Sequence, residues 1–176
     1  RPSDGGLEVF GTPSFEYSAD HSRILVSGRT EALEGPLYLV DRSRNYGAKT
    51  LPAGSRPSEI LSSLSREGDR LIVRSKDGAL RVLNADTFET DAALQEILDR
   101  ERTDYFYAGF VPESDLILAV RAATKPNLIR GGTAELVVTD RATRRTLLRE
   151  PFRMAGSMPA FRAKIFRDGA FLSFEG

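Results

Sequence analysis

One pattern of strand-like runs and polar turns occurs four times in this 176-residue chain, and it limits the possible fold more than any other feature. Each complete copy has a strand-like run, a polar turn, a second apolar run, another turn and a third apolar run that ends in Asp or Asn. The runs have the length of about five or six residues that is usual for strands. Gly, Asp and Ser in the turns favour chain reversal. The pattern therefore predicts antiparallel β-meanders in series.

The copies can be matched position by position, although the fourth is incomplete. The third run of each of the first three copies ends in a residue that we expect to form an Asx-type turn, because Asp and Asn side chains accept hydrogen bonds from the backbone that follows them. The matched positions are Ile24, Leu71, Leu116 and Phe171 at the start of the second run, and Asp41, Asn84 and Asp140 at the end of the third.

The second copy, within Leu51–Asn84, carries a resemblance to a known family. Its markers are Gly54, Pro57, Gly68-Asp69, Leu71-Ile-Val73, Asp77-Gly78 and Val82. In this spacing the segment resembles the YVTN-type repeat of lactonase-like β-propellers and is more distantly similar to WD40 repeats. The resemblance implies an all-β, propeller-like array of antiparallel blades, three nearly complete and one shared or incomplete. Such folds serve as hydrolases, dehydrogenases and scaffolds, so the resemblance leaves the activity open.

We expect a single domain over residues 1–176. The repeats would cover about 12–54, 55–103 and 104–157, and a fourth would combine 158–176 with 5–11. In a closed ring, Leu7–Gly11 would be the outer strand of that fourth blade, which removes exposed sheet edges. The alternatives are a segment of a propeller with about six to eight blades, and a sandwich or open meander built from the same hairpins.

Residues 91–102 interrupt the β pattern. Asp91 is a suitable helix cap, and Leu94, Ile97 and Leu98 fall on one stripe of a helix. We predict a short surface helix that covers a sheet edge, and the alternative is a docking helix for a partner.

Composition excludes several kinds of chemistry. The chain has no cysteine, which excludes disulfides, Cys zinc sites and a thiol nucleophile, and its one histidine is His21 in a turn. It has neither a Gly-x-Ser-x-Gly elbow nor a Gly-rich phosphate loop. We therefore expect no catalytic residues, no metal site and no cofactor, and we favour a protein that is not an enzyme.

Charge and hydropathy restrict the partners. Lys plus Arg and Asp plus Glu both number 25, so bulk charge gives no argument for nucleic acid, and no apolar run reaches the length of a membrane span. Acidic residues dominate 81–120 and basic residues dominate the chain from 121 onward. This asymmetry predicts ion pairs between neighbouring blades or, alternatively, steering of charged partners.

Five basic residues are candidates for binding. Arg29, Lys76 and Arg121 follow the second strand in three copies, and such positions would form a ring on one face that binds a phosphate or carboxylate. Lys125 and Arg130 lie in the loop 122–133, the longest insertion between paired strands, where binding often occurs. The alternatives are a solvated strand end and a flexible hairpin tip.

These observations favour a non-catalytic propeller module that acts as a binding scaffold for a partner protein or ligand. The partner would be a protein, or another chain or further blades that complete the propeller. The alternative is a segment of a propeller enzyme, such as a lactonase-like hydrolase or a periplasmic dehydrogenase subunit, whose catalytic groups lie outside this chain. A third possibility is a structural surface or envelope protein. A periplasmic or extracellular location is favoured over the cytoplasm.

Overall fold

Each copy of the sequence pattern forms its own antiparallel sheet in this computed structural model, because alternating side chains give each strand one face to bury. The structure describes residues 14–27, 37–50, 62–74, 79–99, 105–111, 114–122, 132–154, 160–166 and 169–175.

The sheets are named here as blades. Blade 1 comprises β1 (Ser14–Tyr17), β2 (Arg23–Ser27), β3 (Leu37–Asp41), a 3-10 turn at Arg42–Arg44 and β4 (Gly47–Thr50). Blade 2 comprises β5 (Ser62–Leu64), β6 (Arg70–Arg74), β7 (Leu80–Asn84) and helix α1 (Ala92–Asp99). Blade 3 comprises β8 (Tyr105–Phe110), β9 (Leu116–Ala122), β10 (Gly132–Asp140) and β11 (Thr146–Met154), and the hairpin of β12 (Ala160–Phe166) and β13 (Gly169–Glu175) follows.

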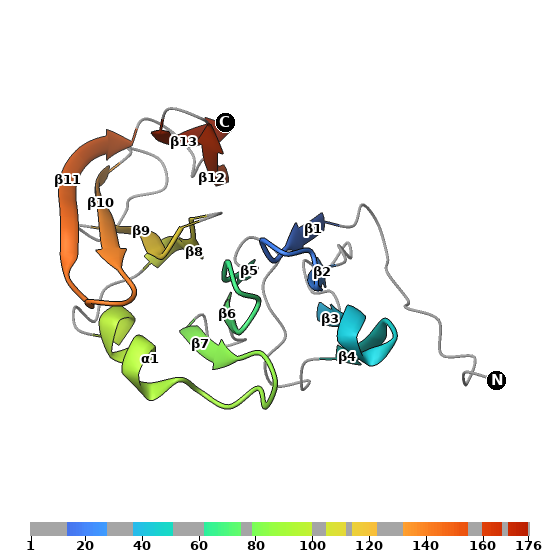
Figure 1. The fold of residues 1–176 in the computed structure, drawn as a ribbon. Coiled ribbons are helices and arrows are strands. Elements are labelled where there is room, and N and C mark those ends of the chain that lie inside the picture. The colour runs from blue at the N-terminus through green and yellow to red at the C-terminus, as the bar shows by residue number, and fades with distance from the viewer. Residues whose placement is uncertain are drawn as a thin grey trace.

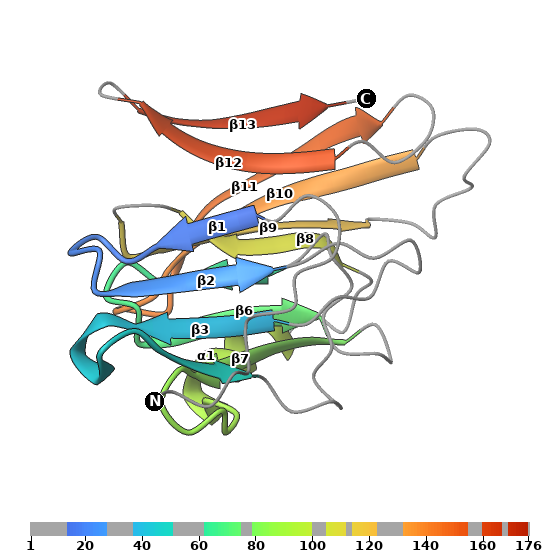
Figure 2. The same ribbon diagram turned by 90° about the vertical axis from the view of Figure 1, so that its right-hand side faces the viewer.

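Strands that are consecutive in sequence are neighbours in every sheet, and all the pairs are antiparallel. The blades follow one another along an open arc, with blade 1 at one end and the β12–β13 hairpin at the other (Figure 1). Viewed from the side, the four strands of blade 1 run next to one another and the hairpin lies at the far end of the molecule (Figure 2). The predicted series of β-meanders with one short helix is confirmed for the described residues.

Buried hydrophobic clusters join blade 1 to blade 2 and blade 2 to blade 3. Between blades 1 and 2 the cluster contains Leu25, Leu37 and Leu39 on one side and Leu64, Leu71, Val73 and Leu83 on the other. Between blades 2 and 3 it contains Ile72, Leu80 and Val82 on one side and Ala108, Phe110, Ile117 and Ala119 on the other. We call the face of a blade that is directed toward the start of the series its leading face, and the opposite face its trailing face. The trailing face of blade 1 contacts the leading face of blade 2, and the trailing face of blade 2 contacts the leading face of blade 3.

The strand register corrects one detail of the sequence alignment. Tyr17 pairs with Ile24, Leu64 pairs with Leu71, and Phe110 pairs with Ile117. The residue equivalent to Ile24 and Leu71 in blade 3 is thus Ile117, and matching Leu116 to them was wrong by one position. Leu116 instead takes the place of Arg23 and Arg70, since all three close the first turn of their blades through their carbonyl oxygens.

Helix α1 replaces a fourth strand in blade 2. Asp91 caps it, because its Oδ1 accepts hydrogen bonds from the N–H groups of Ala93 and Leu94, each at 3.1 Å. Leu94 and Leu98 are buried in the cluster between blades 2 and 3. The expected range 91–102 is confirmed as Ala92–Asp99 within the described residues, and so is its interpretation as the cover of a sheet edge.

Gln95 completes the hydrogen bonding of the outer edge of β7. Its Nε2 donates to the carbonyl oxygen of Leu80 at 2.9 Å, and its Oε1 accepts from the N–H of Val82 at 2.8 Å. The N–H of Asp91 donates to the carbonyl oxygen of Val82, and the N–H of Asn84 donates to that of Glu89, both at 2.8 Å. The side-chain amide thus takes the place of a peptide group in a neighbouring strand, which protects an otherwise open edge.

The expected outer strand Leu7–Gly11 and the repeat segment 5–11 lie outside the described residues. Within the described ranges, no helix is both long and apolar enough to cross a membrane.

Candidate binding site

The same backbone hydrogen bond closes the first turn in all three blades. The N–H of Ser18 donates to the carbonyl oxygen of Arg23 at 3.0 Å, and Ser65 and Val111 make the equivalent bonds at 2.9 and 2.8 Å. In blades 1 and 2 the serine hydroxyl also accepts from the backbone N–H that closes the turn, at 3.0 Å. Positive φ angles at His21 (55°) and Gly68 (71°) reverse the chain at equivalent positions.

The second turn is also repeated, and it confirms the expected Asx turns. Asp41 accepts from Ser43 N–H at 2.9 Å, Asn84 from Asp86 N–H at 2.8 Å, and Asp140 from Thr143 N–H at 2.6 Å. The hydrogen bond from the Ser43 hydroxyl lowers the pKa of Asp41, and the bond from the Thr143 N–H lowers the pKa of Asp140. The positive-φ residues that follow are Asn45, Phe88 and Arg144.

Backbone hydrogen bonds tie these two turns together in each blade. Arg42, Ala85 and Arg141 donate their N–H groups to Ser22, Asp69 and Asp115, at 2.8, 2.9 and 2.7 Å. The paired turns of three blades therefore line one side of the arc, which we call the turn rim. Because the same bonds recur, the rim is a repeated surface.

Ion pairs on the turn rim cross from blade to blade. Arg141 of blade 3 lies 2.6 Å from Glu67 and 3.2 Å from Asp69 of blade 2, and 2.9 Å from Asp115 of its own blade. Although burial opposes it, the three carboxylates raise the pKa of Arg141 above its ordinary value. Arg23 of blade 1 similarly donates to the Gly68 carbonyl at 2.8 Å. Arg141 thus forms ion pairs between blades, but Glu67 and Asp69 lie outside the acidic segment 81–120, and Asp115, which lies within it, belongs to the same blade as Arg141. The interpretation of the charge asymmetry as pairing between blades therefore stays a prediction.

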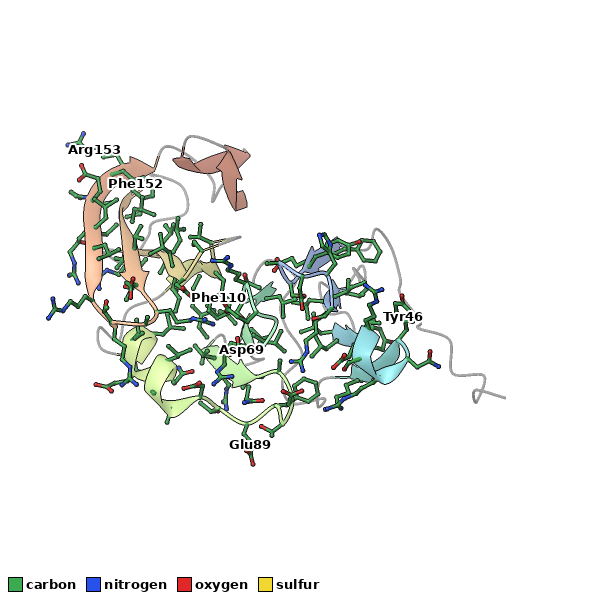
Figure 3. The ribbon with its side chains drawn as sticks, viewed as in Figure 1. Tyr46, Asp69, Glu89, Phe110, Phe152 and Arg153 are labelled. Carbon is green, nitrogen blue, oxygen red and sulfur yellow. The ribbon has the colours of Figure 1, made fainter. Side chains whose placement is uncertain are left out.

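The inner strands carry a chain of hydrogen bonds across three blades. The Glu16 carboxylate on β1 accepts from the N–H of Leu64 on β5 at 2.8 Å, and it also interacts with the Ser63 hydroxyl. Ser63 Oγ accepts in turn from the N–H of Phe110 on β8 at 3.0 Å. Figure 3 shows Phe110 at the junction of blades 2 and 3. Burial raises the pKa of Glu16 to about 7, although both hydrogen bonds oppose the shift.

The sequence did not single out Glu16 as functional. Its neighbours Phe15 and Tyr17 are half exposed while its own carboxyl group faces blade 2. This reverses the usual arrangement, in which the apolar residues of a strand point inward. The alternation Phe15-Glu16-Tyr17 was the available signal, but it does not say which face of the strand is covered.

Of the predicted binding residues, the structure describes one. Arg121 on β9 is buried and forms an ion pair with Glu135, its cross-strand partner on β10. Because Ile117 is equivalent to Leu71, Arg121 is equivalent to Ser75 and not to Lys76. The match that placed Arg121 in one ring with Arg29 and Lys76 is therefore displaced by one residue. Arg29, Lys76, Lys125 and Arg130 lie outside the described residues.

Among the inner-strand side chains that the structure describes, two exposed aromatic groups lie on the leading face of blade 1. Phe15 and Tyr17 are 51% and 52% exposed, and the Tyr17 ring lies 5.7 Å from that of His21. Among the described residues, no cluster of three or more His, Asp or Glu side chains is placed to hold a metal.

Solved structures similar to this chain define its fold. It matches TolB from Agrobacterium tumefaciens with a TM-score of 0.54 at 14% identity, over 94% of this chain and 59% of that one. It matches the dihydro-heme d1 dehydrogenase NirN with a TM-score of 0.51 at 17% identity, over 94% and 32%. The β-propeller domain of Cps50 (Swd1) from Myceliophteria thermophila gives 0.49 at 11% identity, over 98% and 65%.

The fold is therefore that of consecutive β-propeller blades. The chain spans less than two thirds of the TolB chain and about a third of the NirN chain. No protein-family description matches the sequence, and no curated protein matches it.

Proposed function

We propose that this chain is a non-catalytic β-propeller module that serves as a binding scaffold for a partner protein or ligand. The observation that carries the proposal is that three blades are packed firmly against one another while one apolar face at the end of the series stays exposed. Two buried clusters and the inner hydrogen-bond chain hold three blades in one arrangement. At one end of the arc, Phe15 and Tyr17 stay half exposed, and exposed aromatic groups on a rigid support are typical of interaction surfaces.

The proposal also includes a family, a division of the chain into repeats, and a set of basic contact residues. We retain the YVTN-type resemblance of Leu51–Asn84 as the family hypothesis, and the division into repeats 12–54, 55–103, 104–157 and 158–176 plus 5–11. We also retain Arg29, Lys76, Arg121, Lys125 and Arg130 as candidate contacts for an anionic group on the partner. Further blades or another chain would complete the propeller.

A second candidate is a segment of a propeller enzyme. The observation that favours it is the similarity to NirN, a dehydrogenase, over only a third of that chain. On this hypothesis the catalytic groups belong to blades other than those described here.

Affinity capture with chemical crosslinking tests the scaffold. We expect the purified chain to retain a defined partner from an extract of its source, and we expect the double variant Lys125→Ala/Arg130→Ala to retain less of it. The exposed Arg145 supplies the matched control, because it lies in the turn between β10 and β11, at the end of this strand pair opposite the loop, and Arg145→Ala removes a charge there. If the chain retains nothing but converts a substrate, the enzyme alternative is correct and the scaffold is wrong.

A further inference from the structure

The second turn of blade 1 is one residue longer than the equivalent turns of blades 2 and 3. The strand pairings that enclose the three turns are Val40 with Ala48, Leu83 with Thr90, and Thr139 with Thr146. They leave seven residues in the first of these turns (41–47) and six in each of the others (84–89 and 140–145). In every blade the fourth residue after the Asx position has a positive φ, and these residues are Asn45, Phe88 and Arg144. The additional residue of blade 1 is therefore Tyr46, which follows Asn45.

Tyr46 adopts a backbone conformation that is costly for a residue with a large side chain. Its φ is 59° and that of Asn45 is 55°, so two successive residues lie in the left-handed region. Glycine enters this region without a steric penalty and asparagine tolerates it, whereas a bulky residue is strained there. Gly47, the next residue, has no positive φ. The turn thus places a tyrosine where a glycine would fold more easily, and such strain is often found where a side chain has a function.

Packing does not account for the strain at Tyr46. The side chain is 62% exposed, more than any other large hydrophobic side chain of the described residues. Within the described ranges it forms no hydrogen bond and no aromatic contact. Figure 3 shows Tyr46 beside the 3-10 turn Arg42–Arg44 of blade 1. By contrast, Phe88 in the equivalent turn of blade 2 packs against the buried cluster between blades 1 and 2.

Two exposed arginines lie on the same part of the turn rim. Arg42 begins the 3-10 turn that leads to Tyr46, and its N–H donates to the carbonyl oxygen of Ser22 at 2.8 Å. The carbonyl oxygen of Arg66, in the first turn of blade 2, accepts from the N–H of Ala19 at 2.7 Å. These bonds hold the backbone of both arginines against the first turn of blade 1. Within the part of the chain that the structure describes, neither guanidinium forms an ion pair.

The carboxylates of this part of the rim are already engaged. Arg23 lies 3.5 Å from Asp41 and 2.7 Å from Asp86. Arg44 lies 3.7 and 3.6 Å from the same two carboxylates. Asp20 accepts two hydrogen bonds within its own turn, at 2.7 and 3.0 Å. The surface beside Tyr46 therefore offers unpaired positive charge, which carboxylates of a partner would neutralise.

We propose that Tyr46, Arg42 and Arg66 form a contact surface for an acidic segment of a partner protein. The inference rests on the proposed scaffold function and gives the chemistry of the partner. Carboxylates of the segment would accept hydrogen bonds from the two guanidinium groups, and an apolar side chain of the segment would pack on the Tyr46 ring. Tyrosine and arginine are among the residue types that supply most of the binding energy in protein interfaces.

The charge pattern favours a protein segment over a nucleic acid. A single-stranded nucleic acid can stack a base on an exposed aromatic ring, but its backbone carries a charge at every nucleotide. Arginines of the rim alternate with the carboxylates of Asp20, Glu67 and Asp86, which would repel a continuous row of phosphates. A peptide can place separate carboxylates opposite the arginines alone.

Selection from a random peptide library displayed on phage, with the purified chain as the target, tests the proposal. Phage that bind the variant Tyr46→Gly are removed first, and the remaining phage are selected on the wild type. We expect the enriched peptides to combine several Asp or Glu residues with an aromatic or aliphatic residue. Enrichment of peptides without acidic residues, or no enrichment above background, would overturn the proposal.

Fluorescence anisotropy with a labelled synthetic copy of an enriched peptide then gives affinities. Tyr46→Gly should weaken binding at least about tenfold, whereas Tyr46→Phe, which keeps the ring, should stay within about twofold. Arg42→Gln should weaken binding about threefold or more and reduce its dependence on salt, because one screened charge contact is lost. A labelled oligothymidylate is the probe for nucleic acid, and binding of it as tight as that of the peptide would contradict an acidic protein partner.

Arg144→Gly is the matched control. Arg144 has a φ of 57° in the equivalent turn of blade 3, so both glycine variants relieve a left-handed residue and only one removes the ring. Neither variant should lower the Tm, and only Tyr46→Gly should lose the peptide. An equal loss of binding in both variants would overturn the proposal. If the partner retained in affinity capture binds Tyr46→Gly as tightly as the wild type, this contact surface is wrong and the scaffold function stands.

Discussion

Burial and charge oppose each other at Glu16. Its carboxyl group lies between blades 1 and 2, where it accepts the N–H of Leu64 and contacts the Ser63 hydroxyl. These bonds favour the ionised form, but burial outweighs them and raises the pKa to about 7. A group whose folded-state pKa lies above its unfolded value of 4.5 stabilises the fold only while it is protonated.

The stability of the protein should therefore fall as the pH rises from about 4.5 to about 7. In that range the unfolded chain releases the Glu16 proton while the folded chain retains it, and the loss amounts to about 3 kcal/mol at most. Urea denaturation at a series of pH values measures it. Glu16→Gln keeps an acceptor for Leu64 and removes the charge, so it should abolish the slope and be more stable than the wild type above pH 7.

The exposed Glu89 provides the control for this experiment (Figure 3). Glu89→Gln should keep the wild-type slope. The carboxyls with lowered pKa, such as Asp41 and Asp140, act below this range, because the stability they provide is lost as the pH falls through their folded pKa values. Equal slopes for the wild type and Glu16→Gln would show that Glu16 is not the source.

A second prediction at the scale of single residues concerns backbone strain at Gly68. Its φ of 71° lies in the left-handed region, and a Cβ there would meet the Arg23 Cδ at 3.0 Å and the Ser18 Cβ at 3.1 Å. Gly68→Ala should destabilise the protein by about 1–2 kcal/mol, through backbone strain and the crowding of blade 1. Thermal unfolding would show this as a lower Tm. Gly47→Ala, at an exposed glycine without a positive φ, should change it less, because its Cβ would lie close to the Arg44 carbonyl oxygen, at 3.1 Å, but would cause no backbone strain.

At the scale of elements, the main finding is that one side chain can substitute for a strand. Blade 2 has three strands, and the fourth position is taken by the segment leading into α1 and by Gln95. The helix also fills the space between blades 2 and 3 through Leu94 and Leu98. Helix α1 and its leading segment thus protect the edge of β7 and also bury apolar side chains between blades 2 and 3.

The variant Gln95→Ala separates edge protection from burial. It leaves Leu94 and Leu98 in place but removes the partners of the Leu80 carbonyl and the Val82 N–H. We expect a loss of about 1–2 kcal/mol and faster hydrogen exchange at Val82. Glu96→Ala, on the exposed side of the same helix, is the control for helix propensity. Unchanged exchange at Val82 in Gln95→Ala would mean that the amide does not protect the edge.

At the scale of the whole molecule, the blades are coupled in series. A buried hydrophobic cluster joins blade 1 to blade 2, and another joins blade 2 to blade 3. An inner-strand hydrogen bond and an ion pair on the turn rim also join blades 2 and 3. Nearest-neighbour coupling of this kind is characteristic of repeat proteins, whose stability depends on the interfaces as much as on the units.

Arg141 allows that coupling to be tested. Arg141→Gln should lower stability by about 1 kcal/mol, because it breaks the link to Glu67 and Asp69 and leaves three carboxylates close together. The loss should shrink as salt is added, since the repulsion is screened. Denaturation of wild type and variant at low and high ionic strength measures this. Arg145→Gln, at an exposed position outside the cluster, should show neither effect.

The sequence by itself determined the meanders, the helix and the Asx turns, because each depends on residues close together in the chain. Asp41, Asn84 and Asp140 bond to groups two or three residues away, so composition and spacing suffice to predict them. The one-residue error at Leu116 arose because an apolar residue there takes the place of Arg23 and Arg70. Only the turn hydrogen bonds show the true match with Ile117.

Tertiary structure alone decided which faces are covered. Glu16 meets Leu64, and Ser63 meets Phe110, across 48 and 47 positions of sequence. No local pattern states which side of β1 receives a neighbour, because a strand with apolar residues on one face and a carboxylate on the other is compatible with either. The packing of one blade on the next resolved this. It put the Glu16 carboxylate against blade 2, left Phe15 and Tyr17 exposed, and so placed the candidate binding surface.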